Sequence, residues 1–133
     1  MAETVSLQLP ERLHRRLVNA AQATGRPLES VILRALTIGS PPDWNDAPAE
    51  YQPALAALDR LEDGALWKIA RARKLAKDMM RYDQLLEANQ TRTLTDDEQV
   101  ELHRLRQDAE QFMLRKAHAA AILKWRGHHV SAT

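Results

Sequence analysis

Apolar and polar residues alternate near the N-terminus of the chain. In the stretch TVSLQL, every second residue is apolar: Val5, Leu7 and Leu9. The residues between them are polar: Thr4, Ser6 and Gln8. A period of two is typical of a half-buried β-strand. The pattern therefore predicts a short strand over residues 4–9, and the backbone N–H and C=O groups of that strand need a partner.

The apolar period changes to that of a helix after this stretch. Pro10 suits the first turn of a helix, where the missing N–H is not needed. Leu13 and Leu17 follow at helical spacing, and Gly25 is a natural C-terminal stop. Beyond the turn GRP, apolar residues recur at helical positions: Leu28, Val31, Ile32, Ala35 and Leu36. A second amphipathic helix ending at Gly39 is therefore predicted.

Residues 41–53 interrupt the helical pattern. They contain four prolines and three acidic residues and have no periodicity, which is typical of a linker. Helical spacing returns over residues 54–133, with a long helix over about 65–88 and another from Thr95 to about Arg126. Thr95 and Glu98 match a capping box. We therefore expect a mainly α fold with three parts: residues 1–40, a Pro-rich acidic linker over 41–53, and a helical hairpin or bundle over 54–133.

The N-terminal part is too small to bury a core of its own. Folds below about 40 residues usually depend on metals, disulfides or oligomerisation, and the chain contains no cysteine. Two copies of residues 4–9, paired antiparallel across a two-fold axis, would supply the missing partner strand. The core of this predicted dimer is apolar and consists of Val5, Leu7, Leu9, Leu17, Ile32 and Leu36. The outer face of the ribbon would then fit the DNA major groove.

The first 40 residues resemble a known family. The matching stretches, in chain order, are the alternating TVSLQL, the helix start PERL, the turn TGRPLESV and the helix ILRALTIG. Residues 4–39 resemble a ribbon-helix-helix DNA-binding domain, an intertwined dimer with one strand and two helices per chain. The resemblance implies that the outward strand positions Thr4, Ser6 and Gln8 contact bases. It also implies that the start of the second helix holds a phosphate through the backbone of Leu28 and Glu29, with Ser30 close by.

The sequence departs from this family in the charge of its strand. Family members often carry Arg or Lys there, whereas this strand has only neutral polar residues. Gln8 suits adenine, but Thr4 and Ser6 discriminate between bases weakly. Attraction to phosphate must then come from arginines outside the strand: Arg12, Arg15, Arg16, Arg26 and Arg34. The alternative is a dimerisation module that has lost DNA binding.

Charge is distributed in blocks along the chain. Residues 1–40 carry five Arg against three Glu, residues 41–64 carry six acids against one Arg, and residues 65–92 carry seven bases against three acids. Solvated faces explain most such blocks, and patches that guide different partners are the alternative. The basic stretch WKIARARKLAKDMMR predicts a packed helix with a basic outer face; direct nucleic-acid binding by residues 65–126 is the alternative.

No pattern in the sequence predicts an enzyme, a metal site or a cofactor site. His103, Glu110 and His118 are seven and eight residues apart, which is not the spacing of a helical zinc site. The adjacent His128 and His129 make a poor chelate. The chain also lacks an apolar run of about 20 residues that could span a bilayer, a signal-peptide pattern and cysteine. We therefore expect a cytoplasmic protein without membrane contact.

The order of the three parts is similar to that of a bacterial antitoxin, in which an N-terminal DNA-binding segment represses the operon and the C-terminal region neutralises a toxin. This similarity implies a toxin or another protein partner for residues 41–126. The leading hypothesis is a homodimeric, sequence-specific transcriptional regulator that binds double-stranded DNA and is the antitoxin or autorepressor of a toxin–antitoxin-type module. The alternative hypothesis is an interaction or adaptor protein that uses its N-terminal segment only to dimerise.

Overall fold

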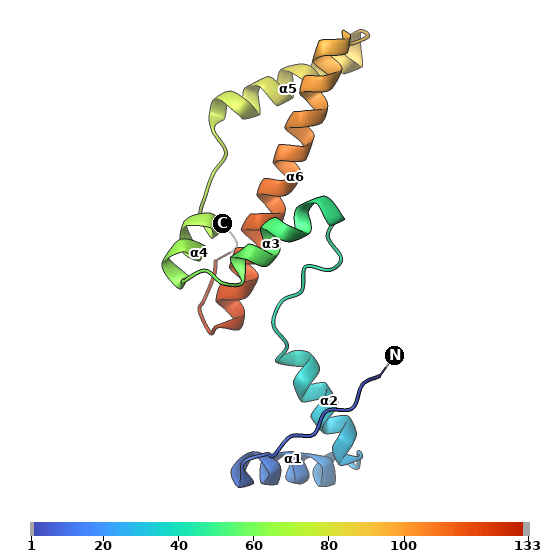
Figure 1. Cartoon of the computed structure of the whole chain (residues 1–133), viewed down its shortest axis with the longest axis vertical. Coiled ribbons are helices and arrows are strands. Elements are labelled where there is room, and N and C mark those ends of the chain that lie inside the picture. The colour runs from blue at the N-terminus through green and yellow to red at the C-terminus, as the bar shows by residue number, and fades with distance from the viewer. Residues whose placement is uncertain (1, 132–133) are drawn as a thin grey trace. The chain divides into compact units, whose positions relative to one another are not determined.

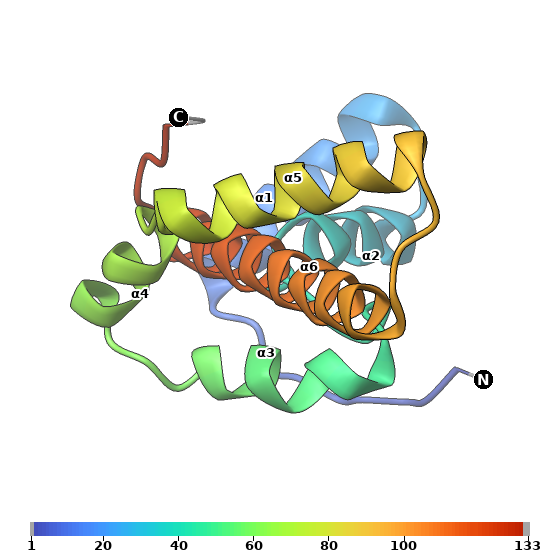
Figure 2. The ribbon, with the colours of Figure 1, turned by 90° about the horizontal axis from the view of Figure 1, so that it is seen from above.

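The computed structural model describes residues 2–131 and divides the chain into two compact units, Met1–Ser40 and Pro41–Thr133. All regular structure in the described residues is helical, as Figures 1 and 2 show. The mainly α class predicted from the sequence is therefore confirmed.

The first unit contains two helices, α1 (Glu11–Thr24) and α2 (Leu28–Ile38). The predicted stop at Gly25 is confirmed, because Gly25 has a left-handed backbone with φ 64°. Its N–H and that of Arg26 bond to carbonyls in the last turn of α1, which reverses the chain into α2. The predicted end of the second helix at Gly39 is also confirmed.

The prediction of a strand over residues 4–9 is wrong. Within residues 2–131 no segment forms a β-strand, and residues 4–9 run as an irregular segment beside α2 (Figure 1). This finding overturns the resemblance to a ribbon-helix-helix domain and the fold class based on it. The physical reason is that alternation defines only an apolar and a polar face. A strand exists only when its N–H and C=O groups pair with a neighbouring strand, and the described part of this chain offers none.

The second unit contains a short 3₁₀ helix, η1 (Ala49–Tyr51), followed by α3 (Gln52–Leu58), α4 (Asp63–Ala70), α5 (Ala76–Thr91) and α6 (Asp96–Trp125). One core forms where α3 and α4 meet the C-terminal half of α6: Leu55, Leu58, Leu66, Ala70, Ala119, Ile122 and Leu123. A smaller core joins α5 to the N-terminal half of α6: Leu85, Leu94, Leu102 and Leu105. Figure 2 shows α5 beside α6. α6 contributes residues to both cores.

The long helix predicted over about 65–88 is interrupted. α4 ends at Ala70, and α5 begins only at Ala76. Lys116 of α6 donates from Nζ to the carbonyl of Ala72 at 3.1 Å and so fixes the connector between the two helices. The interruption lets α4 and α5 pack on different halves of α6, whereas a single straight helix would follow one line along it.

The start of α6 carries the predicted capping box. Thr95 Oγ1 accepts from the Glu98 N–H at 3.2 Å, and Glu98 Oε1 accepts from the Thr95 N–H at 3.0 Å. Arg92 donates from Nη2 to Glu98 Oε2 at 2.7 Å. These hydrogen bonds, with that of Arg92 first, lower the pKa of Glu98 from its ordinary 4.5 to about 2.

Candidate nucleic-acid interface

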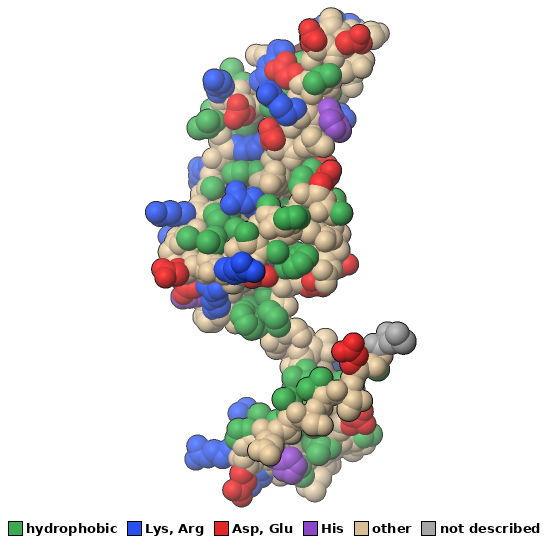
Figure 3. Space-filling model, viewed as in Figure 1, with side chains coloured by type: hydrophobic (Ala, Val, Ile, Leu, Met, Phe, Trp, Pro, Cys, Tyr) green, Lys and Arg blue, Asp and Glu red, His purple; other side chains and the backbone are tan. Residues whose placement is uncertain are grey.

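The first unit leaves most of its apolar side chains in solvent. Ala21 is the one buried residue among residues 2–40, and no residue of α2 is buried. Large apolar side chains remain exposed along residues 4–9 and α2: Val5, Leu7, Leu33, Leu36 and Ile38. Four of these five side chains, all except Ile38, line a hollow of about 740 Å³. The other apolar residues that line it are Leu9, Leu28 and Ile32. Figure 3 shows apolar side chains gathered on the surface of this unit.

The residues predicted to form a dimer core fall into two groups. Val5, Leu7 and Leu36 are 75%, 69% and 54% exposed in the single chain. Leu9, Leu17 and Ile32 are half-buried. All except Leu17 line the same apolar hollow, so the structure brings most of the predicted set together. Sequence reasoning missed the exposed Leu33 and Ile38, because neither belongs to the helical stripe of the apolar run VILRALTI.

The side chains predicted to read bases all lie on the irregular N-terminal segment. Thr4, Ser6 and Gln8 are exposed. Thr4 lines the apolar hollow, whereas Ser6 and Gln8 do not. Their role in reading bases stays a prediction, and the ribbon that would have presented them is absent from the described residues.

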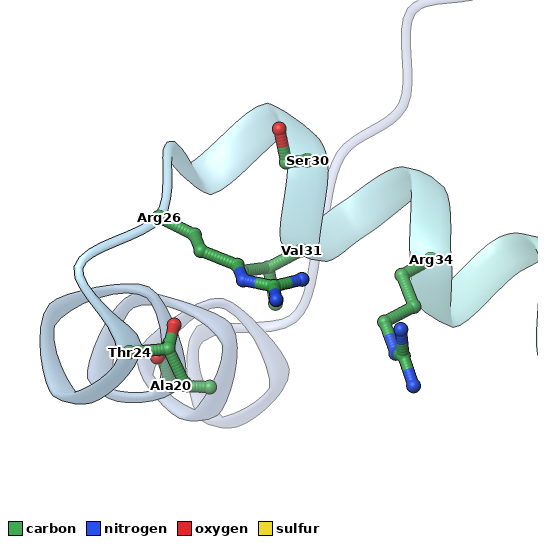
Figure 4. Close-up of a pocket in the computed structure, with 6 residues that line it drawn as sticks. All are labelled: Ala20, Thr24, Arg26, Ser30, Val31 and Arg34. Atoms are coloured by element: carbon green, nitrogen blue, oxygen red, sulfur yellow. The ribbon is translucent and has the colours of Figure 1, made fainter.

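Two arginines share a hollow between α1 and α2. Arg26 lies in the turn and Arg34 two turns further along α2, and with Ser30 they line a space of about 600 Å³. In Figure 4 the two guanidinium groups extend to the same side of α2, while the Ser30 hydroxyl points away from them. No carboxylate lines this hollow, and no ion pair joins either arginine to another described residue.

A second group of arginines lies at the start of α1. Arg12, Arg15 and Arg16 line a hollow of about 490 Å³ with Pro10, Leu13 and Asn19. Arg15 pairs with Glu11 one turn earlier, at 2.9 Å between Nη2 and Oε1, but both side chains are largely exposed. A pair of this kind is weak and is screened by salt. The arginines of the first unit are therefore available to an anionic partner.

The start of α2 keeps its first backbone N–H groups uncapped. Pro27 precedes the helix, and no side chain makes a capping hydrogen bond there. The N–H groups of Leu28 and Glu29 thus meet the requirement for the predicted phosphate contact. Glu29 is exposed in the same turn and adds a negative charge beside them. The positive side chains near this turn are those of Arg26 and Arg34.

The second unit contains a polar cluster that the sequence did not reveal. His118 is only 7% exposed, and its Nε2 lies 2.8 Å from Asp59 Oδ1. Trp44 donates from its indole N–H to the other oxygen of Asp59 at 3.0 Å. The cluster attaches residues of the predicted linker to α3 and α6. Its members are 15 and 59 residues apart in the sequence, so no local spacing could have indicated it.

A neighbouring network involves Asp63 at the start of α4. Arg126 donates to Asp63 Oδ1 at 2.7 Å, and His128 Nε2 lies 2.7 Å from Oδ2. The hydrogen bond from Arg126, followed by that from His128, lowers the pKa of the Asp63 carboxyl.

Tyr51 forms a separate contact elsewhere in the second unit, where its hydroxyl donates to Glu110 at 3.2 Å. The pKa of Tyr51 is raised, first by burial and second by the hydrogen bond with Glu110.

These clusters serve to hold the helices together. Among the described residues, no three His, Cys, Asp or Glu side chains gather in a way that could hold a metal ion. No helix in residues 2–131 combines the length and the apolar character needed to cross a membrane.

A scan of protein-family models, a search of curated proteins and a search of solved structures return no match to this chain.

Proposed function

We propose that the protein is a homodimeric, DNA-binding transcriptional regulator whose first unit contacts the DNA. The observation that carries the proposal is that Arg26 and Arg34 share one hollow that no carboxylate lines. Arginine is well suited to phosphate, because its planar guanidinium donates two parallel hydrogen bonds to phosphate oxygens. Such contacts supply affinity and fix the position of the protein on a duplex.

The dimer is supported by the exposed apolar face of the same unit. Covering one Leu or Ile side chain completely contributes about 1.5–3 kcal/mol. A single chain lacks much of this burial free energy at Leu33, Leu36 and Ile38, which are 57%, 54% and 73% exposed. A second copy of the chain is the simplest partner, since identical apolar faces complement one another across a two-fold axis.

The second unit is proposed to bind a protein partner. Several large apolar side chains are exposed on α5 and α6, among them Met79, Met80 and Met113. Methionine is flexible and polarisable, and it adapts to varied partner surfaces. A partner of this kind fits the proposed role as the antitoxin or autorepressor of a two-gene module.

The alternative function is that of an adaptor that dimerises without binding DNA. The apolar face of the first unit favours it, because that face requires a partner but no nucleic acid. The two functions differ at the arginines, which the adaptor would not need.

Duplex binding at low salt separates the two functions. We expect the wild-type chain to bind a mixed-sequence duplex, and the double variant Arg26→Ala/Arg34→Ala to bind at least tenfold more weakly, because charge-assisted hydrogen bonds contribute about 1.5–3 kcal/mol each. Arg60→Ala/Arg104→Ala is the matched control, since it also removes two exposed arginines, both of them in the second unit. Failure of the folded wild-type chain to bind, or equal weakening by the control, would reject DNA binding through the first unit.

A further inference from the structure

A polar pocket in the second unit gathers basic side chains from segments far apart in the sequence. Its volume is about 400 Å³. Arg71 comes from the end of α4, Arg73 from the connector to α5, Lys116 from α6, and His129 from the residues that follow α6. The interrupted helix makes this arrangement possible, because the connector carries Arg73 toward α6 instead of onward along a helix. We call this site the basic pocket.

The connector is held in place by contacts that still leave donors free for a ligand. Lys116 donates to the Ala72 carbonyl at 3.1 Å, which uses one of the three N–H bonds of its ammonium group. The guanidinium of Arg71 lies over the Trp67 ring, 4.3 Å from the ring centroid. This stacking orients Arg71 and leaves the N–H bonds at the edge of its guanidinium plane available.

The charges of the basic pocket are not neutralised by the described protein. No carboxylate lines the pocket, and no hydrogen bond or ion pair joins Arg73 or His129 to another described residue. Asp63, one turn before Trp67 on α4, already accepts from Arg126 and lies against His128. Arg71, Arg73 and Lys116 thus place three positive charges around one small space. Like charges that line one space repel one another, and an anion bound among them would offset that repulsion.

We propose that the basic pocket binds the phosphate group of a small phosphorylated molecule. Two guanidinium groups and an ammonium group around one space are suited to the several oxygens of a phosphate or diphosphate. A volume of about 400 Å³ falls within the range of about 300–1,000 Å³ that small-ligand sites occupy. The residues after α6 form one wall, so the site is a concavity rather than an open basic stripe along which a nucleic acid could run.

Calorimetric titration of the full chain with sodium pyrophosphate tests this proposal. We expect saturable binding of one pyrophosphate per chain and a rise in the thermal unfolding temperature. Arg73→Ala should weaken binding at least tenfold, and Arg73→Lys should weaken it less, because the charge is kept while the two-pronged hydrogen bonding is lost. Arg73 has no hydrogen bond to another described residue, so its replacement should leave the circular dichroism spectrum unchanged.

Lys77→Ala is the matched control. Lys77 is exposed on α5, four residues from Arg73, and does not line the pocket. Its replacement by Ala therefore removes one positive charge from outside the pocket. We expect its affinity for pyrophosphate to stay within twofold of the wild type. Equal weakening by Lys77→Ala and Arg73→Ala would overturn the proposal, because it would indicate general charge attraction. Absence of pyrophosphate binding by the folded wild-type chain would also overturn it. A third result would overturn it as well: a DNA duplex that displaces pyrophosphate and whose own binding is abolished by Arg73→Ala. The site would then be a nucleic-acid site.

Discussion

Leu36→Ala tests the apolar face of the first unit as a dimer interface. Leu36 is 54% exposed in the single chain, so about half of its side chain remains for a partner to cover. Full burial of a leucine contributes about 1.5–3 kcal/mol, and covering the exposed half therefore contributes about 0.8–1.6 kcal/mol. A symmetric dimer contains the residue twice, which gives a loss of about 1.6–3.2 kcal/mol per dimer. This loss corresponds to a dimer dissociation constant roughly 15- to 200-fold higher.

Sedimentation equilibrium over a series of protein concentrations measures this constant directly. Leu75→Ala is the matched control, because Leu75 is 69% exposed but lies in the second unit, just before α5. We expect the control to dimerise like the wild type. The reasoning is refuted if Leu36→Ala and Leu75→Ala change the dissociation constant equally, or if the wild-type chain stays monomeric throughout the concentration series.

Two further predictions concern the second unit. The pKa of Glu98 is depressed to about 2, so its interactions stabilise the folded chain above pH 4.5, and that contribution is lost as the pH falls toward 2. Urea unfolding should therefore show Glu98→Gln less stable than the wild type at pH 7, with the gap closing at pH 2; a gap independent of pH would contradict this. Asp59→Ala leaves the buried His118 without its partner and frees the Trp44 indole. We expect a loss of about 1–3 kcal/mol in urea unfolding and a red shift of tryptophan fluorescence, neither of which should occur in the exposed control Asp46→Ala.

The sequence predicted the parts of the fold that depend on local signals. The stops at Gly25 and Gly39 and the capping box at Thr95 are each encoded within a few residues, and the structure confirms them. The strand over residues 4–9 failed because a strand depends on a partner, and alternation of side chains cannot supply one. The break after Ala70 was missed because the apolar period continues through it, while the packing of α4 and α5 on α6 decides where the helix ends.

The candidate sites show the same division. Arg26 and Ser30 were each predicted to lie near a bound phosphate, and they line one hollow because a short turn and the first residues of one helix connect them. The basic pocket and the Asp59–His118 pair depend on residues 43 to 59 positions apart, which only the tertiary fold brings together. Spacing along one helix therefore could not reveal them.

The stoichiometry of the complex with DNA tests the central claim most directly. Sedimentation of a fluorescently labelled duplex at low salt, with increasing amounts of the full chain, reports the mass of the complex that forms. For a homodimeric DNA-binding protein we expect two chains per occupied site, and a complex that dissociates steeply as salt is raised. A duplex that sediments alone at every protein concentration, or a saturated complex with a single chain per site, would contradict the claim.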